Sequence, residues 1–146
     1  MSGEIRVYLP LQPEHLVALQ HGEELETGLR GFAVTEQIRR ALAGDDVEEQ
    51  EFLALQQAAS AARATGAVVL IGAADVPATA LTQAGNDGPA LQVAVALEAK
   101  DFASFHLDDA ALGRSETAPS ADADESIDLS WYDVSEMSQI LRHLIT

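Results

Sequence analysis

The sequence of 146 residues contains no cysteine, a single lysine and few aromatic residues. The absence of cysteine excludes a thiolate nucleophile, cysteine-ligated zinc and thiol redox switching. Lys100 is the one lysine, and its polar surroundings argue against a Schiff-base role, which needs a desolvated amine. The apolar runs are far shorter than the roughly 20 residues of a membrane helix. We therefore expect a soluble cytoplasmic protein.

Basic residues are also scarce. Eight Lys and Arg residues stand against 24 Asp and Glu residues, so the formal net charge is −16 at pH 7. Such a charge opposes binding to nucleic acid or to anionic lipid, and we predict neither as a partner. Two interpretations of the acidity stay open. It serves solubility, or it forms a docking surface for a basic protein or mimics nucleic acid.

The clearest structural signal is the stretch from Gly66 to Pro77. Its unbroken apolar run, Val68 to Ile71, is rich in β-branched residues and is bounded by glycine on both sides. A strand that is apolar on both faces must be covered on both faces. The pattern predicts a central strand near 67–73.

Helical spacing and capping residues predict four helices, near 13–21, 35–43, 46–65 and 134–145. The third carries an apolar stripe at helical spacing, which we expect to pack on the sheet: Phe52, Leu55, Ala59 and Ala62. Asp133 and Glu136 have the spacing of a capping box and open the last helix.

Alternating apolar and polar residues predict further strands at 4–10, 91–97, 103–107 and 127–132, and residues 31–34 are a further short candidate. Because a short turn separates residues 91–97 from 103–107, we expect these two to form an antiparallel hairpin. The chain is predicted to be a single α+β domain over residues 1–146, with a mixed sheet of about five strands. An α/β fold is the alternative. Residues 108–126 lose all periodicity and are expected to form a mobile acidic loop.

Several local patterns occur in a characteristic order: RVYLP, FAVT, EEQEFLALQQAA, VVLIGAADVP, FASFHLDDA and LSWYDVSEM. With these, the chain resembles an uncharacterised domain family, a domain of unknown function, of high-GC Gram-positive bacteria. The resemblance spans nearly the whole chain. It implies a bacterial cytoplasmic protein and assigns no catalytic residue.

One group of residues has the composition of a metal site. His106 and Asp108 are two residues apart on a predicted strand, so their side chains share a face. Asp109 follows them, and Asp75 lies just beyond the predicted central strand. An imidazole and two or three carboxylates could bind a divalent ion and activate water. In the alternative interpretation the acids cap turns and His106 faces solvent. His15, His21 and His143 lie on predicted helices and are expected at the surface.

Other motifs are weaker or absent. The acids and serines from Asp122 to Asp133 imitate the spacing of a calcium loop, but Ile127 replaces the required glycine and Asp133 the bidentate glutamate. The sequence has no G-x-S-x-G, G-x-x-x-x-G-K, G-x-G-x-x-G or H-E-x-x-H motif. Trp131 is expected to pack in the core with Tyr132 at its rim, in preference to stacking on a ligand.

These observations favour a non-enzymatic protein-interaction module, in which an acidic surface or an exposed edge strand meets a protein partner or a second copy of the chain. We predict no cofactor. The alternative is a small metal-binding protein or metal-assisted hydrolase centred on His106, Asp108 and Asp75. Whether the protein is an enzyme stays open, with the absent motifs arguing against it.

Overall fold

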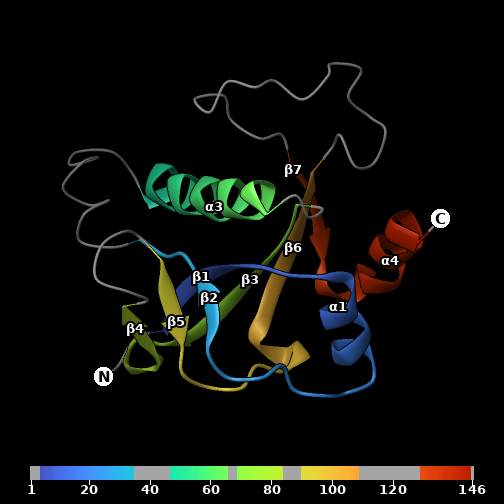
Figure 1. The fold of residues 1–146 in the computed structure, drawn as a ribbon, viewed down its shortest axis with the longest axis horizontal. Helices are drawn as coiled ribbons and strands as arrows, with labels where there is room; N and C mark the ends of the chain where they lie inside the picture. The colour runs from blue at the N-terminus through green and yellow to red at the C-terminus, as the bar shows by residue number, and fades with distance from the viewer. Residues whose placement is uncertain (1–3, 35–46, 66–68, 84–89, 109–128, 146) are drawn as a thin grey trace.

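The structure is a computed structural model that describes residues 4–34, 47–65, 69–83, 90–108 and 129–145 (Figure 1). The helices are α1 (Pro13–Gln20), α3 (Val47–Ala64) and α4 (Met137–Ile145), with short 3₁₀ turns at Ala78–Ala80, Ala99–Asp101 and Val134–Glu136. The strands are β1 (Glu4–Pro10), β2 (Leu29–Gly31), β3 (Leu70–Pro77), β4 (Leu81–Gln83), β5 (Leu91–Val93), β6 (Phe102–Asp108) and β7 (Leu129–Asp133).

The strands form two antiparallel sheets. One has four strands in the order β1-β3-β6-β7 and the other has three in the order β2-β5-β4. The sheets meet where Tyr8 and Phe32 exchange backbone hydrogen bonds, with N···O distances of 2.7 and 2.8 Å. This architecture confirms the α+β class. It replaces the single mixed sheet that we predicted, because every neighbouring pair of strands is antiparallel.

The predicted hairpin of residues 91–97 with 103–107 is wrong. β5 pairs with β2 and β4, whereas β6 pairs with β3 and β7. The chain between them crosses from one sheet to the other, and Leu97 on the way forms a bridge with Leu25. The short connection favoured pairing, but the two strands belong to different sheets, and their apolar residues are buried in one common core between the sheets.

The central position of β3 is confirmed. It lies between β1 and β6, and its residues are buried on both faces of the sheet. Leu70, Ala74 and Val76 point into a large core that α1, α4 and the three-stranded sheet complete. Ile71 and Ala73 point to the opposite face, under α3. The strand extends to Pro77, beyond its predicted end at residue 73.

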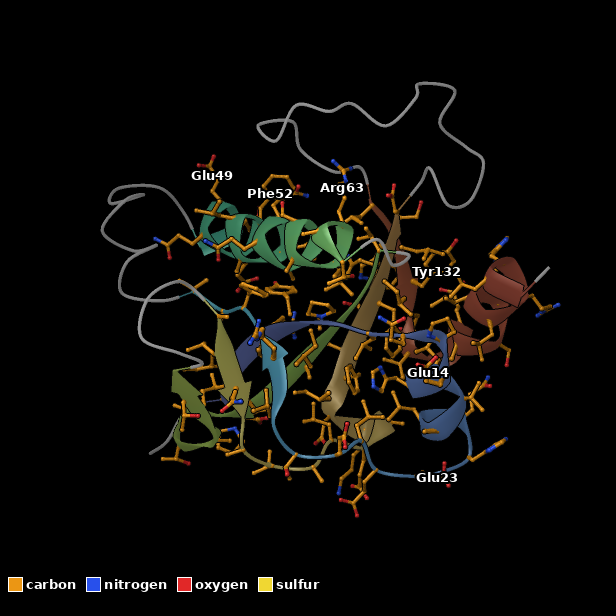
Figure 2. The ribbon with its side chains drawn as sticks, viewed as in Figure 1. Glu14, Glu23, Glu49, Phe52, Arg63 and Tyr132 are labelled. Carbon is orange, nitrogen blue, oxygen red and sulfur yellow. The ribbon has the colours of Figure 1, made fainter. Side chains whose placement is uncertain are left out.

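α3 covers the second face through small side chains. Ala54, Ala58, Ala59 and Ala62 are buried against the sheet, which lets the helix axis lie close to the strands. The predicted stripe was wrong at Phe52, which is 52% exposed. At 100° per residue, Phe52 points about 120° away from Ala58. Figure 2 shows it beside Glu49 and Arg63 on the side of α3 that faces away from the sheets.

The other helices agree with their predicted positions, except that the helix predicted at 35–43 lies outside the described residues. α1 and α4 lie side by side, and Gln20 Nε2 donates a hydrogen bond of 2.7 Å to Ser138 Oγ between them (Figure 1). The predicted capping box is confirmed, because Asp133 N donates to Glu136 Oε1 at 2.8 Å and Ser135 N donates to Asp133 Oδ2 at 3.0 Å.

Gly72 lies at a close approach of side chains in the large core. A Cβ at this position would lie 2.6 Å from Cε1 of Phe102 and 2.7 Å from Cδ1 of Leu11. Both neighbours are buried side chains of the core. β3 therefore needs glycine here for space rather than for an unusual backbone conformation.

We predict that Gly72→Ala lowers the free energy of unfolding by about 1–3 kcal/mol, because an extra methyl in a packed core forces its neighbours to move. Urea unfolding measures the change. Adding Phe102→Leu should recover part of the loss by opening space beside the new methyl. A variant as stable as the original chain would contradict this account of the core.

Candidate functional site

The polar side chains that the fold gathers lie on the α3 side of the four-stranded sheet. Strand register defines two rows across this face. The first joins Tyr8, Ala73, Ser104 and Asp133, and the second joins Pro10, Ile71, His106 and Trp131. Beside the first row, Arg6 of β1 pairs with Asp75 of β3. We call this set the polar strip: Arg6, Tyr8, Asp75, Ser104, His106, Trp131 and Asp133.

Arg6 and Asp75 form a bidentate ion pair at one end of the strip. Nε and Nη2 of Arg6 donate to the two carboxylate oxygens of Asp75, each at 3.0 Å. The hydrogen bond to Asp75 raises the pKa of Arg6. Both side chains are more than a third exposed, so the pair stabilises the fold by about 1 kcal/mol or less. The prediction that Asp75 lies beyond the central strand is wrong, because β3 continues through it.

His106 lies at the centre of the strip, partly buried. Its Nε2 is 3.0 Å from Oγ of Ser104, and its ring meets the Tyr8 ring edge to face with a centroid distance of 6.5 Å. Burial, and secondarily the positive charge of Arg6, lower the pKa of His106 to about 4. The imidazole is therefore neutral at neutral pH. It does not simply face solvent, as one interpretation of the sequence held.

Tyr8 connects the strip to α3. The side chain is buried, and burial is the main cause that raises the pKa of Tyr8 to about 12. The negative charge of Glu51 on α3 and its hydrogen bond with the tyrosine act in the same direction. The phenol therefore stays protonated and helps to hold the helix on the sheet.

The Ser104–His106 pair has the chemistry of a nucleophile and its base, but its surroundings do not suit catalysis. Ser104 is only 6% exposed. A serine nucleophile must reach the substrate carbonyl, and this hydroxyl is covered. The geometry fits a hydrogen bond that satisfies two polar groups inside the fold.

Three of the four predicted metal ligands, Asp75, His106 and Asp108, lie within the described residues. Asp108 ends β6, and its amide donates to the carbonyl of Val69 at 3.1 Å. Asp75 is six residues further along the chain than Val69, or about 20 Å in an extended strand. Among the described residues no three His, Asp or Glu side chains are grouped as a metal site. Asp109 lies outside them, so the four-residue site stays a prediction.

Other candidates from the sequence are placed as follows. Residues 109–128, which hold most of the predicted acidic loop and of the calcium-like spacing, lie outside the described residues. His21 and His143 are exposed, as expected. His15 is partly buried instead, because its Nδ1 accepts a hydrogen bond of 2.8 Å from the Gln12 amide at the start of α1.

The predicted roles of Trp131 and Tyr132 are reversed. Trp131 is 61% exposed, whereas Tyr132 is 4% exposed and packs in the large core. The register explains this, because Tyr132 lies opposite Phe105 on the core face and Trp131 lies opposite His106 on the α3 side. α3 packs mainly on β1 and β3, and the Trp131 side chain stays exposed.

The sequence analysis missed Arg6, Tyr8 and Ser104. The spacing S-x-H at 104–106 was a usable signal, since residues two apart on a strand share a face. Nothing local indicated the partners of Arg6 and Tyr8, because Asp75 and Glu51 are distant in the chain and only the folded sheet and helix bring them close.

Comparison with known proteins identifies a family. The chain matches the model of a family of unknown function, DUF6912, over residues 5–141. It belongs to this family. The predicted membership in an uncharacterised family is thereby confirmed. Neither the curated proteins nor the solved structures provide a significant match. In this DUF6912 member, none of the described helices is long and apolar enough to span a membrane.

The neutral imidazole generates a prediction for pH. Because the pKa of His106 is lower in the folded chain than its ordinary value near 6.5, unfolding takes up a proton, and stability falls as the pH drops below 6.5. Between pH 7 and pH 5 this one group should remove about 2 kcal/mol from the free energy of unfolding.

The variant His106→Gln should lack this component. Urea unfolding at both pH values should therefore show a smaller loss of the free energy of unfolding for His106→Gln than for the original chain. The control variant His21→Gln, at an exposed position, should lose as much as the original chain. Equal pH dependence for all three chains would show that His106 titrates normally.

Two tyrosines offer a matched comparison. The hydroxyl of Tyr132 is buried without a hydrogen-bond partner among the described residues, so Tyr132→Phe should leave stability unchanged or raise it by about 1 kcal/mol. Tyr8→Phe removes a hydrogen bond to a carboxylate and should cost about 1.5–3 kcal/mol. Urea unfolding measures both, and equal losses would contradict the different environments.

Proposed function

We propose that this protein is a non-enzymatic interaction module that binds an extended segment of a basic partner protein along the edge of β7. The observation that carries the proposal is Trp131, which is 61% exposed on a strand at the edge of the four-stranded sheet. Exposed tryptophan is a frequent anchor of protein interfaces. An edge strand offers backbone donors and acceptors to a further strand.

β7 suits this role better than the other edges. The outer edge of β1 is already engaged by Phe32, and β4 contains only three residues. β7 has five residues, and its buried Tyr132 fixes it to the core while Trp131 points outward. A rigid strand loses little conformational freedom when a segment adds to it.

The net charge of the chain favours one class of partner. A net charge of −16 on each chain opposes close association of two copies and attracts a basic protein over a long range. Next to the tryptophan, Asp133 lies exposed on the same face of β7, and hydrogen bonds from Ser135 lower the pKa of its carboxyl group. The burial of the Ser104 hydroxyl argues against a role as a nucleophile.

A peptide selection tests the proposal. A display library of random peptides, selected on the intact protein, should yield binders enriched in basic residues. Added to the ¹⁵N-labelled protein, these should shift the amide resonances of β7. Trp131→Ala should weaken binding at least tenfold, because a buried anchor is lost. Phe52→Ala removes another exposed aromatic side chain, on α3, and should have no effect.

Three results would contradict the proposal. Selection could yield no binders, or yield binders that Trp131→Ala leaves unaffected. Alternatively, sedimentation could reveal a dimer that Trp131→Ala dissociates, in which case a second copy of the chain occupies β7 and the basic partner is excluded from it.

A further inference from the structure

We infer that the segment bound along β7 carries an arginine whose guanidinium stacks on the indole of Trp131 and reaches the carboxylate of Asp133. This inference rests on the proposed function and names the residue of the bound segment that β7 recognises. It follows from the relative position of the two side chains, their exposure and the chemistry of their groups.

The first step is position. Trp131 and Asp133 are two residues apart on β7, so their side chains leave the same face of the sheet, with Cα atoms about 7 Å apart. Their cross-strand neighbours on β6 are His106 and Ser104. A planar cation on the indole therefore lies within reach of the carboxylate.

The second step is charge. Asp133 is exposed, and the hydrogen bonds from Ser135 favour its ionised form. His106, the nearest basic side chain by register, is neutral at neutral pH because it is buried. The carboxylate of Asp133 therefore makes the face around Trp131 negative, and β6 contributes no positive charge there. A bound cation would meet no repulsion from β6.

The third step is the choice between basic residues. A tryptophan face attracts both lysine and arginine, but a guanidinium also stacks its plane on the ring and holds a carboxylate with a fixed fork of donors. The paired arrangement of an indole and a carboxylate along one strand therefore favours arginine.

The chain provides its own reporter. Trp131 is the one tryptophan in the sequence, so the indole N–H resonance, and fluorescence excited at the red edge where the two tyrosines do not absorb, both report on this position alone. The probe is a capped heptapeptide in which valine and threonine alternate around a central arginine. Matched peptides carry lysine, which is charged but not planar, or citrulline, which is planar but neutral.

We expect the arginine peptide to change the tryptophan fluorescence and to bind at least fivefold tighter than the citrulline peptide, with the lysine peptide between them. Asp133→Asn retains an oxygen that can cap the following helix while removing the charge. It should reduce the preference for arginine over citrulline. Glu23→Gln removes a charge in the segment after α1 and should leave the preference intact (Figure 2).

The outcomes separate the two proposals. If all three peptides shift the β7 amide resonances with equal affinity, the arginine inference is wrong and strand addition stands. If arginine is preferred but Asp133→Asn keeps the full preference, the carboxylate has no part in it and the inference is also wrong. If no peptide perturbs β7 or the indole, both the inference and strand addition at this edge are rejected.

Discussion

The burial of β3 on both faces is the constraint on which the rest of the structure depends. One face packs into the large core through Leu70 and Val76, and the other contacts α3 through Ile71 and Ala73. Covering both faces of a strand requires layers on both sides of its sheet. The middle of the strand is built from small residues, Gly72 to Ala74, which let the Phe102 ring and α3 approach closely.

The position of β3 decides which polar groups meet. β1 and β6 are its two neighbours, so Arg6 reaches Asp75 along one side, and Tyr8 and His106 meet across it. Burial then controls their chemistry, because it is the main cause of the raised pKa of Tyr8 and of the lowered pKa of His106. Burial shifts the pKa values of these two groups, and burial also keeps the Ser104 hydroxyl from reaching a substrate.

The side chains of the polar strip differ in their exposure. Tyr8 and Ser104 are buried, His106 is partly buried, and Trp131 is largely exposed. The exposed edge aromatic is the observation on which the proposed binding function rests. If the proposed function holds, the net charge of −16 favours positively charged partners over a long range, and this component of binding should weaken with salt.

The amino-acid sequence by itself determined those features that depend on near neighbours in the chain. The apolar run of β3, the helical spacing of α3 and the capping pair Asp133–Glu136 each act over a few residues, and the structure confirms all three. It also determined the charge of the chain and the absence of thiol chemistry. The four-residue metal hypothesis and the acidic loop depend on segments outside the described residues.

Only the tertiary structure decided the pairing of the strands and the exposure of their side chains. Alternation shows that Trp131 and Tyr132 face opposite sides of the sheet, but it does not show which of them faces the core. The pairing of Tyr132 with the buried Phe105 places Tyr132 on the core face. The packing of the core likewise decides which side of α3 faces the sheet. Phe52 points outward because the alanines of α3 pack closer to β3. Contacts such as Arg6–Asp75 join residues 69 positions apart, and no local pattern contains that information.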